Sequence, residues 1–206
     1  MRKYLILSVC FISFLAMIMY SCTDVSMARK LAGEWKANYM TVYSNGEKDS
    51  IKEHLTFVYD EESVDDDGSF IERLDCQTNE ITEGCYGYTI HYESYVSGRY
   101  EIVGGNLYLK YDLATLEVVI CDDDVRLKVK NLSTGLDMLD DLVTTLEMPK
   151  HEFVAECKKE IYASLFRQYK YNSSDEVSFQ DLYIDGESMS YKHEDGIVKY
   201  IRCNKM

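Results

Sequence analysis

The stretch WKANYMTVY at residues 35–43 decides the fold class, because its side chains alternate with a period of two. One phase holds Trp35, Ala37, Tyr39, Thr41 and Tyr43, and the other holds Lys36, Asn38, Met40 and Val42. This alternation is typical of a strand with one buried face. Asn45-Gly46 then predicts a turn, and a second strand follows with Ile51, Leu55, Phe57 and Tyr59 on its apolar phase.

The same period recurs through most of the chain. It predicts further strands at 70–76, 86–92, 100–102, 107–111, 116–121 and 125–132, and three more at 177–184, 189–192 and 197–203. Gly104-Gly105-Asn106 predicts a tight hairpin turn, and a second hairpin is expected across Asp122-Asp123-Asp124. We therefore expect a mainly β fold, an antiparallel meander that closes into a barrel.

The period changes to a helical one at residues 134–172. One predicted helix carries Leu136, Leu139, Leu142, Val143 and Leu146 on one face. Pro149 can open a second helix, whose apolar stripe is Phe153, Cys157, Ile161, Leu165 and Tyr169. We expect a two-helix insertion whose stripe packs on the barrel. The alternative is an exposed face that binds a partner.

The N-terminus reads as an export signal. Arg2 and Lys3 precede an uncharged apolar run at 4–20, and Met19-Tyr20-Ser21-Cys22 resembles a lipobox. We expect residues 1–21 to be a lipoprotein signal peptide, Cys22 to be lipidated, 22–29 to be a tether, and 30–206 to be the domain. The alternatives are an uncleaved membrane anchor, for which the run is short, and simple secretion.

The lipidation signal predicts the cellular location of the protein. It places the chain in the cell envelope, attached to a membrane by its lipid anchor. Thr23 follows the cysteine where the inner-membrane retention signal has Asp. We therefore expect the outer membrane, on its periplasmic or its surface side.

The charge of the exported part excludes some partners. Without Arg2 and Lys3 the remaining chain has 20 basic and 36 acidic side chains, a net charge of −16. That charge argues against nucleic acid and against adsorption to anionic lipid. The acidic runs at 60–62, 65–67 and 122–124 are expected to be solvated turns. A calcium loop starting at Ser63 would have Leu74 where its bidentate Glu belongs, so we expect no metal.

Cysteine and histidine give weaker signals. Cys76 and Cys85 flank a polar turn and are the predicted disulfide pair, with reduced core cysteines as the alternative. The four histidines are scattered, and no zinc-protease, nucleophile-elbow or phosphate-loop motif is present. Glu53 and His54 are neighbours on a strand and point to opposite faces. We therefore expect no catalytic residues, no cofactor and no enzyme.

Four short motifs together resemble one family. They are Leu31-Ala32-Gly33-Glu34-Trp35, Leu55-Thr56-Phe57 with Asp67-Gly68, Tyr100-x-Ile102-x-Gly104 with Leu107-Tyr108-Leu109, and the closing Tyr200-Ile201-Arg202. Their order is similar to that of lipocalins (calycin-type β-barrels) and of the lipocalin-like lipoproteins of gut Gram-negative anaerobes. The resemblance covers most of 31–133 and 176–203, and the helical segment 134–172 departs from it. It implies that Arg202 stacks on Trp35 at the closed end of the barrel, a contact of roughly 1 kcal/mol.

The resemblance implies a cup for a small apolar or amphipathic ligand. Its aromatic lining would be Tyr39, Tyr43, Tyr86, Tyr88, Tyr92 and Tyr100. The alternative for these tyrosines is simple filling of the interior. The second function hypothesis is a non-enzymatic accessory lipoprotein that docks another envelope protein through the helical insertion.

Overall fold

A computed structural model gives the structure of the chain. It describes residues 24–42, 48–59, 67–78, 81–83, 86–120, 125–130, 137–139, 149–172, 179–193 and 196–203. The export signal at 1–21 and the lipidation residue Cys22 therefore lie outside the described residues, as do most of the acidic runs.

Antiparallel strands make up most of the described chain. They are β1 (Gly33–Val42), β2 (Lys48–Tyr59), β3 (Asp67–Thr78), β4 (Ile81–Glu83), β5 (Tyr86–Val103), β6 (Asn106–Val119), β7 (Val125–Lys130), β8 (Asp137–Leu139), β9 (Gln180–Ile184), β10 (Ser188–His193) and β11 (Gly196–Arg202). They form one sheet in the order β8-β7-β5-β3-β2-β1-β11-β10-β9, and β4 and β6 also pair with β5. The predicted mainly β meander is confirmed.

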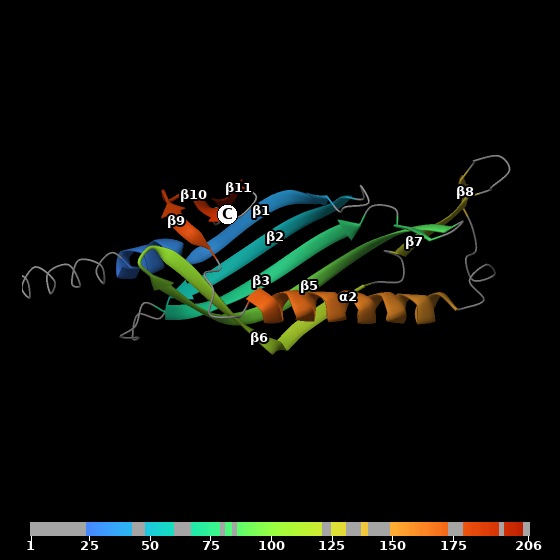
Figure 1. Ribbon diagram of the computed structural model, residues 1–206, viewed down its shortest axis with the longest axis horizontal. Coiled ribbons are helices and arrows are strands. Elements are labelled where there is room, and N and C mark those ends of the chain that lie inside the picture. The colour runs from blue at the N-terminus through green and yellow to red at the C-terminus, as the bar shows by residue number, and fades with distance from the viewer. Residues whose placement is uncertain are drawn as a thin grey trace, which may run out of the picture.

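The sheet curls into a half-barrel whose two edges meet at one end (Figure 1). The amides of Leu107 and Phe179 each donate to the carbonyl of the other at 3.0 Å, which joins the start of β6 to the residue before β9. Leu182 donates to the Gly105 carbonyl beside them at 3.0 Å. We call this end, where the turn at 104–105 lies, the closed end.

Two helices complete the described part of the chain. Residues 24–31 form an N-terminal helix at the closed end. The long helix α2 (Lys150–Asn172) comes before the last three strands, as predicted, and lies along the sheet where β9–β11 do not reach. Cys157, Leu165 and Tyr169 of its apolar stripe and the adjacent Val154 are buried against the inner face of β3, β5 and β6, so the predicted packing is confirmed.

Three details of the prediction are wrong. Residues 137–139, placed in the first inserted helix, form strand β8 on β7, and the rest of that segment lies outside the described residues. β7 does not make a hairpin with β6: both pair with β5, which at 18 residues is long enough for both. Residues 24–29, expected as tether, belong to the N-terminal helix because Ala28 and Leu31 pack into the core.

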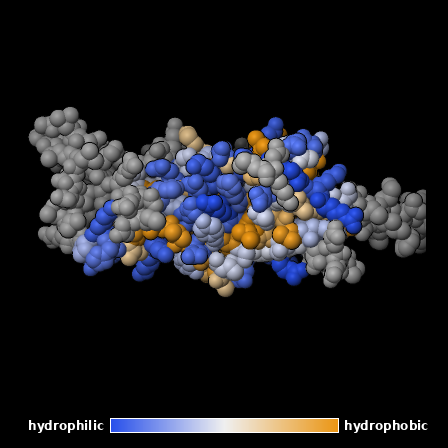
Figure 2. Space-filling model, turned by 180° about the vertical axis from the view of Figure 1, so that it is seen from behind, coloured by the Kyte–Doolittle hydropathy of each residue, from blue (hydrophilic) through white to orange (hydrophobic). Residues whose placement is uncertain are grey.

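The outer face of the sheet is polar at its centre, with separate hydrophobic patches (Figure 2). On this face Arg73 pairs with Glu93 at 2.7 Å, and Asp75 pairs with Lys52 at 3.2 Å and His91 at 2.9 Å. In the described part of the chain, no helix combines the length and the apolar character needed to cross a membrane.

Candidate functional site

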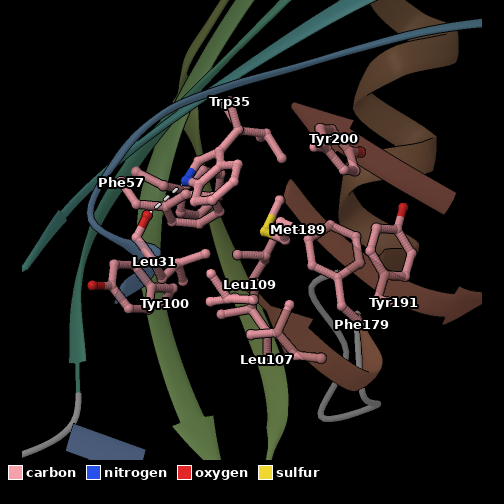
Figure 3. Close-up of a cluster of buried hydrophobic side chains, with 14 of the residues drawn as sticks. Leu31, Trp35, Phe57, Tyr100, Leu107, Leu109, Phe179, Met189, Tyr191 and Tyr200 are labelled. Carbon is pink, nitrogen blue, oxygen red and sulfur yellow. Dashed lines mark hydrogen bonds between the residues drawn. The ribbon is translucent and has the colours of Figure 1, made fainter. Parts of the chain in front are cut away.

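The predicted contact between Trp35 and Arg202 is present at the closed end. The guanidinium carbon of Arg202 lies 4.2 Å from the centre of the Trp35 ring, and the indole is fully buried. The two residues are also register partners on β1 and β11. The Trp35 Nε1 donates to the Leu31 carbonyl at 2.7 Å (Figure 3), so the indole holds the N-terminal helix as well.

Arg202 caps the carbonyl end of the N-terminal helix. Its Nη1 donates to the Ala32 carbonyl at 3.0 Å, its Nη2 donates to the Lys30 carbonyl, and its Nε donates to the Gly186 carbonyl at 2.7 Å. A cation at the C-terminal end of a helix is favourable because the helix dipole is negative there. Gly33 makes room for it, since a Cβ at this position (φ +130°) would lie 2.8 Å from the Arg202 Nη1.

Next to this cap the half-barrel is filled by large apolar side chains (Figure 3). We call the following residues the closed-end core: Ala28, Leu31, Trp35, Phe57, Tyr100, Leu107, Leu109, Phe179 and Met189. Phe57 meets Tyr100 edge to face with ring centres 5.3 Å apart. Met189 lies between the Trp35 side and Phe179. This end of the interior is therefore packed with side chains, as expected for a small barrel.

A polar layer crosses the interior above the closed-end core. Its members are two glutamates and five tyrosines from six strands and the helix: Tyr39, Glu53, Glu72, Tyr111, Tyr169, Tyr191 and Tyr200. The Tyr200 hydroxyl donates to Glu53 at 2.9 Å, and Tyr39 is hydrogen-bonded to the same carboxyl. Glu72 accepts from Tyr111 at 2.9 Å and from Tyr169 at 2.5 Å.

The strand register explains why the two carboxyl groups are neighbours. Glu53 lies opposite Leu74, and Leu55 lies opposite Glu72, so the glutamates are diagonal neighbours on the inner face of β2 and β3. Diagonal side chains of an antiparallel pair lie close enough to interact. Both glutamates are buried, at 7% and 5% exposure. Within the described residues, neither makes an ion pair with Lys or Arg.

Burial without a cation shifts the titration of this pair. Burial raises the pKa of Glu53, the charge of Glu72 raises it further, and the hydrogen bonds from Tyr200 and Tyr39 oppose the shift only in part. Burial also raises the pKa of Glu72, against the hydrogen bonds from Tyr169 and Tyr111. Ionising two adjacent buried carboxyl groups costs free energy through desolvation and mutual repulsion. The pair therefore keeps a proton at a pH at which free carboxyl groups have lost theirs.

The predicted ligand-binding tyrosines are dispersed. Tyr39 belongs to the polar layer and is 38% exposed, whereas Tyr100 is buried in the closed-end core. Tyr92 is half-buried against α2 and is hydrogen-bonded to Cys76. Tyr43 and the side chains of Tyr86 and Tyr88 lie outside the described residues. The structure thus brings only Tyr39 to the polar layer.

Neither glutamate of the layer was predicted from the sequence. The signal was present, because Glu53 falls in the same phase as Ile51, Leu55 and Phe57, and Glu72 falls in phase with Phe70 and Leu74. An acid in the apolar phase of a strand is a buried acid. Its tyrosine partners carry no comparable signal, since tyrosine is frequent along the whole chain, with 18 residues.

The remaining predicted sites have simple outcomes. Cys76 is a buried free thiol, and its predicted disulfide partner, Cys85, lies outside the described residues. Among the residues with described positions, no group of three or more His, Cys, Asp or Glu side chains could hold a metal ion.

No protein-family model matches the chain, and no curated protein matches it either.

Proposed function

We propose that this protein is a lipid-anchored lipoprotein of the cell envelope whose lipocalin-like half-barrel binds a small amphipathic ligand. In this proposal the protein is a binding protein and not an enzyme. Its anchor is the acylated Cys22, and its expected site is the outer membrane.

The polar layer is the observation that carries the proposal. It is a band of hydroxyl and carboxyl groups inside walls that are otherwise apolar, on both the closed-end side and the α2 side. Ligand sites are mostly apolar with a few convergent polar groups that fix orientation. The polar group of an amphipathic ligand would hydrogen-bond to this layer, and its apolar part would lie against the apolar side chains that pack beside α2.

In this proposal the ligand reaches the polar layer beside Tyr39. β1 pairs with β11 only at Trp35 and Lys36, so the strands separate beyond that point in the described residues. Tyr39 follows on β1 and is the most exposed member of the layer. A ligand entering between β1 and β11 would therefore meet Tyr39 first and Glu53 behind it.

The contact between Trp35 and Arg202 supports the lipocalin-like part of the proposal. The resemblance implied this pairing at the closed end, together with the glycine two residues before the tryptophan. The structure contains the contact and gives Gly33 a steric reason.

The alternative function is docking of an envelope protein through the helical insertion, of which the structure describes 137–139 and α2. The apolar stripe of α2 faces the sheet, and only Tyr162 and Tyr171 among its large apolar side chains are markedly exposed. The described part of the insertion therefore gives less support to docking than the polar layer gives to ligand binding.

Native mass spectrometry of the full chain, purified in mild detergent from its own host, tests ligand binding. We expect a co-purifying small molecule that is lost from the Glu53→Gln variant. The matched control is Tyr183→Phe, which changes an exposed tyrosine on β9 and should keep the molecule. A bare wild-type protein in the native spectrum would contradict the proposal.

The anchor has its own test. Cys22→Ser should abolish acylation. The intact mass of the purified variant should then lack the mass of the acyl chains. Cys10→Ser is the matched control, because Cys10 lies within the apolar run and should be removed with the signal. Retention of residues 1–21 in the mature protein would overturn the lipoprotein proposal in favour of an uncleaved anchor.

A further inference from the structure

The folded body of this protein begins almost at the predicted lipidation site. Asp24 is buried, and its carboxylate accepts hydrogen bonds from the Gly104 amide at 3.0 Å and from the Gly105 amide at 3.2 Å. These amides belong to the turn between β5 and β6 at the closed end. The first described residue of the chain is thus already tied to the barrel.

The rest of the N-terminal helix is fixed to the closed end as firmly. Ala28 and Leu31 are fully buried in the closed-end core, and the Leu31 carbonyl accepts from Trp35. Arg202 holds the carbonyls of Lys30 and Ala32 from the other side. The helix therefore moves with the barrel as one body.

Thr23 is the only residue between Cys22 and Asp24. An extended chain spans at most about 3.6 Å per residue, so the Cα atoms of Cys22 and Asp24 lie within roughly 7 Å of each other. Acyl chains on Cys22 insert in the bilayer and hold that residue at its surface. This places Asp24 and the turn that it binds next to the lipid headgroups.

We propose that the closed end of the half-barrel lies directly against the lipid bilayer, with the opposite end pointing into the aqueous phase. The proposal rests on the proposed acylation of Cys22. Figure 1 shows the N-terminal helix and the first turn of α2 toward opposite ends of the long axis. α2 has 23 residues, so its first residue lies about 35 Å beyond its last one.

Electrostatic attraction to the membrane is not what would produce this orientation. The exported chain carries a net charge of −16, which an anionic headgroup layer repels. The short span between the anchor and the fold is thus what holds the closed end at the membrane. The orientation should therefore depend on the length of that span and little on ionic strength.

Tryptophan quenching by a headgroup-labelled spin lipid tests the orientation. The probe sites are Val103→Trp, an exposed position (48%) beside the closed-end turn, and Glu152→Trp, an exposed position in the first turn of α2. The native Trp35 is the single tryptophan and contributes the same background to both. The acylated full-length variants are reconstituted in phosphatidylcholine vesicles with and without the spin-labelled lipid.

We expect the added fluorescence of Val103→Trp to be largely lost with the spin lipid and that of Glu152→Trp to be kept. Inserting about ten Gly and Ser residues after Thr23, roughly 17 Å of flexible chain, should restore the Val103→Trp signal. Equal quenching at both sites, or quenching that the insertion leaves unchanged, would overturn the proposal. The intact mass distinguishes the two failures: an unacylated protein refutes the anchor, whereas an acylated but unquenched Val103→Trp refutes the orientation.

Discussion

Arg202 lies over the indole of Trp35 at 4.2 Å and, with the same guanidinium group, caps the helix that precedes β1. One side chain from the last strand thus joins the first strand, the N-terminal helix and the turn at Gly186. Because these segments are far apart in sequence, this contact closes the end of the fold and links the two termini of the described chain.

Replacing Arg202 should therefore destabilise the whole fold. Arg202→Met keeps an unbranched apolar side chain over Trp35 but leaves the carbonyls of Lys30, Ala32 and Gly186 without their donor. We expect a loss of about 1–2 kcal/mol in the free energy of unfolding, measured by urea denaturation. Lys199→Met, an exposed change on the same strand, is the control. Equal midpoints for the two variants would contradict the capping role.

The buried glutamate pair predicts how stability depends on pH. The pKa of Glu53 is raised in the folded state, chiefly by burial and then by the charge of Glu72, whereas the unfolded carboxyl titrates near 4.5. The folded protein thus retains a proton that the unfolded chain releases, so the free energy of unfolding should fall as the pH rises above about 5. This contribution is complete below the unfolded pKa and is lost as the pH rises through the folded one.

The control for that prediction is a variant with the same change in net charge. Glu53→Gln should flatten the decline of stability between pH 5 and pH 8, since it removes one of the two titrating groups. Glu117→Gln removes an exposed carboxyl on β6 and should leave the decline in place. A decline of the same slope in both variants would assign it to general charge repulsion and not to the buried pair.

Tyr169 ties α2 to the interior through its hydroxyl. Tyr169→Phe removes one donor from the buried Glu72, which should cost about 1–3 kcal/mol, and loosens α2 more than the strands. In this variant the rate of hydrogen–deuterium exchange should therefore increase more in α2 than in β10 and β11, each compared with the wild type. Tyr171→Phe changes a tyrosine on the same helix that is 73% exposed, and its exchange should match the wild type. If α2 were as well protected from exchange in the Tyr169→Phe variant as in the wild type, this role of Tyr169 would be contradicted.

The sequence predicted individual strands and their buried faces better than it predicted which strands pair with each other. The alternation at 35–43 indicated β1, and the resemblance that the short motifs carry implied that Arg202 would meet Trp35. The same alternation could not show that β7 pairs with β5, because a strand pattern specifies a buried face and not a neighbour. The leucines near 139 fit a helical period, yet Leu139 pairs with Lys128 in a sheet.

The candidate site was harder to predict because it is built from polar residues in apolar positions. The apolar side chains of β2 predicted its buried face, but Glu53 between them was not predicted to be part of a site. Tyr200 bonds to Glu53 from 147 residues away, and no local pattern encodes that distance. Residues 24–29 were expected to be a tether because they are short and polar, although Ala28 and Leu31 make one buried face.

Two glycines give a test of the steric role of the closed end. Gly33 and Gly186 both have positive φ angles, +130° and +97°, so alanine is strained at either position. A Cβ on Gly33 would also lie 2.8 Å from the Arg202 Nη1, whereas a Cβ on Gly186 would meet nothing within 4 Å. Gly33→Ala should therefore cost more than Gly186→Ala in urea denaturation, by about 1 kcal/mol or more, because the displaced guanidinium loses its hold on the N-terminal helix. In the Arg202→Met background the difference in unfolding free energy between Gly33→Ala and Gly186→Ala should become smaller, because the guanidinium group that the added methyl displaces is absent. If the two alanine variants were equally stable with Arg202 in place, the close approach of Arg202 would not be the reason for a glycine two residues before Trp35.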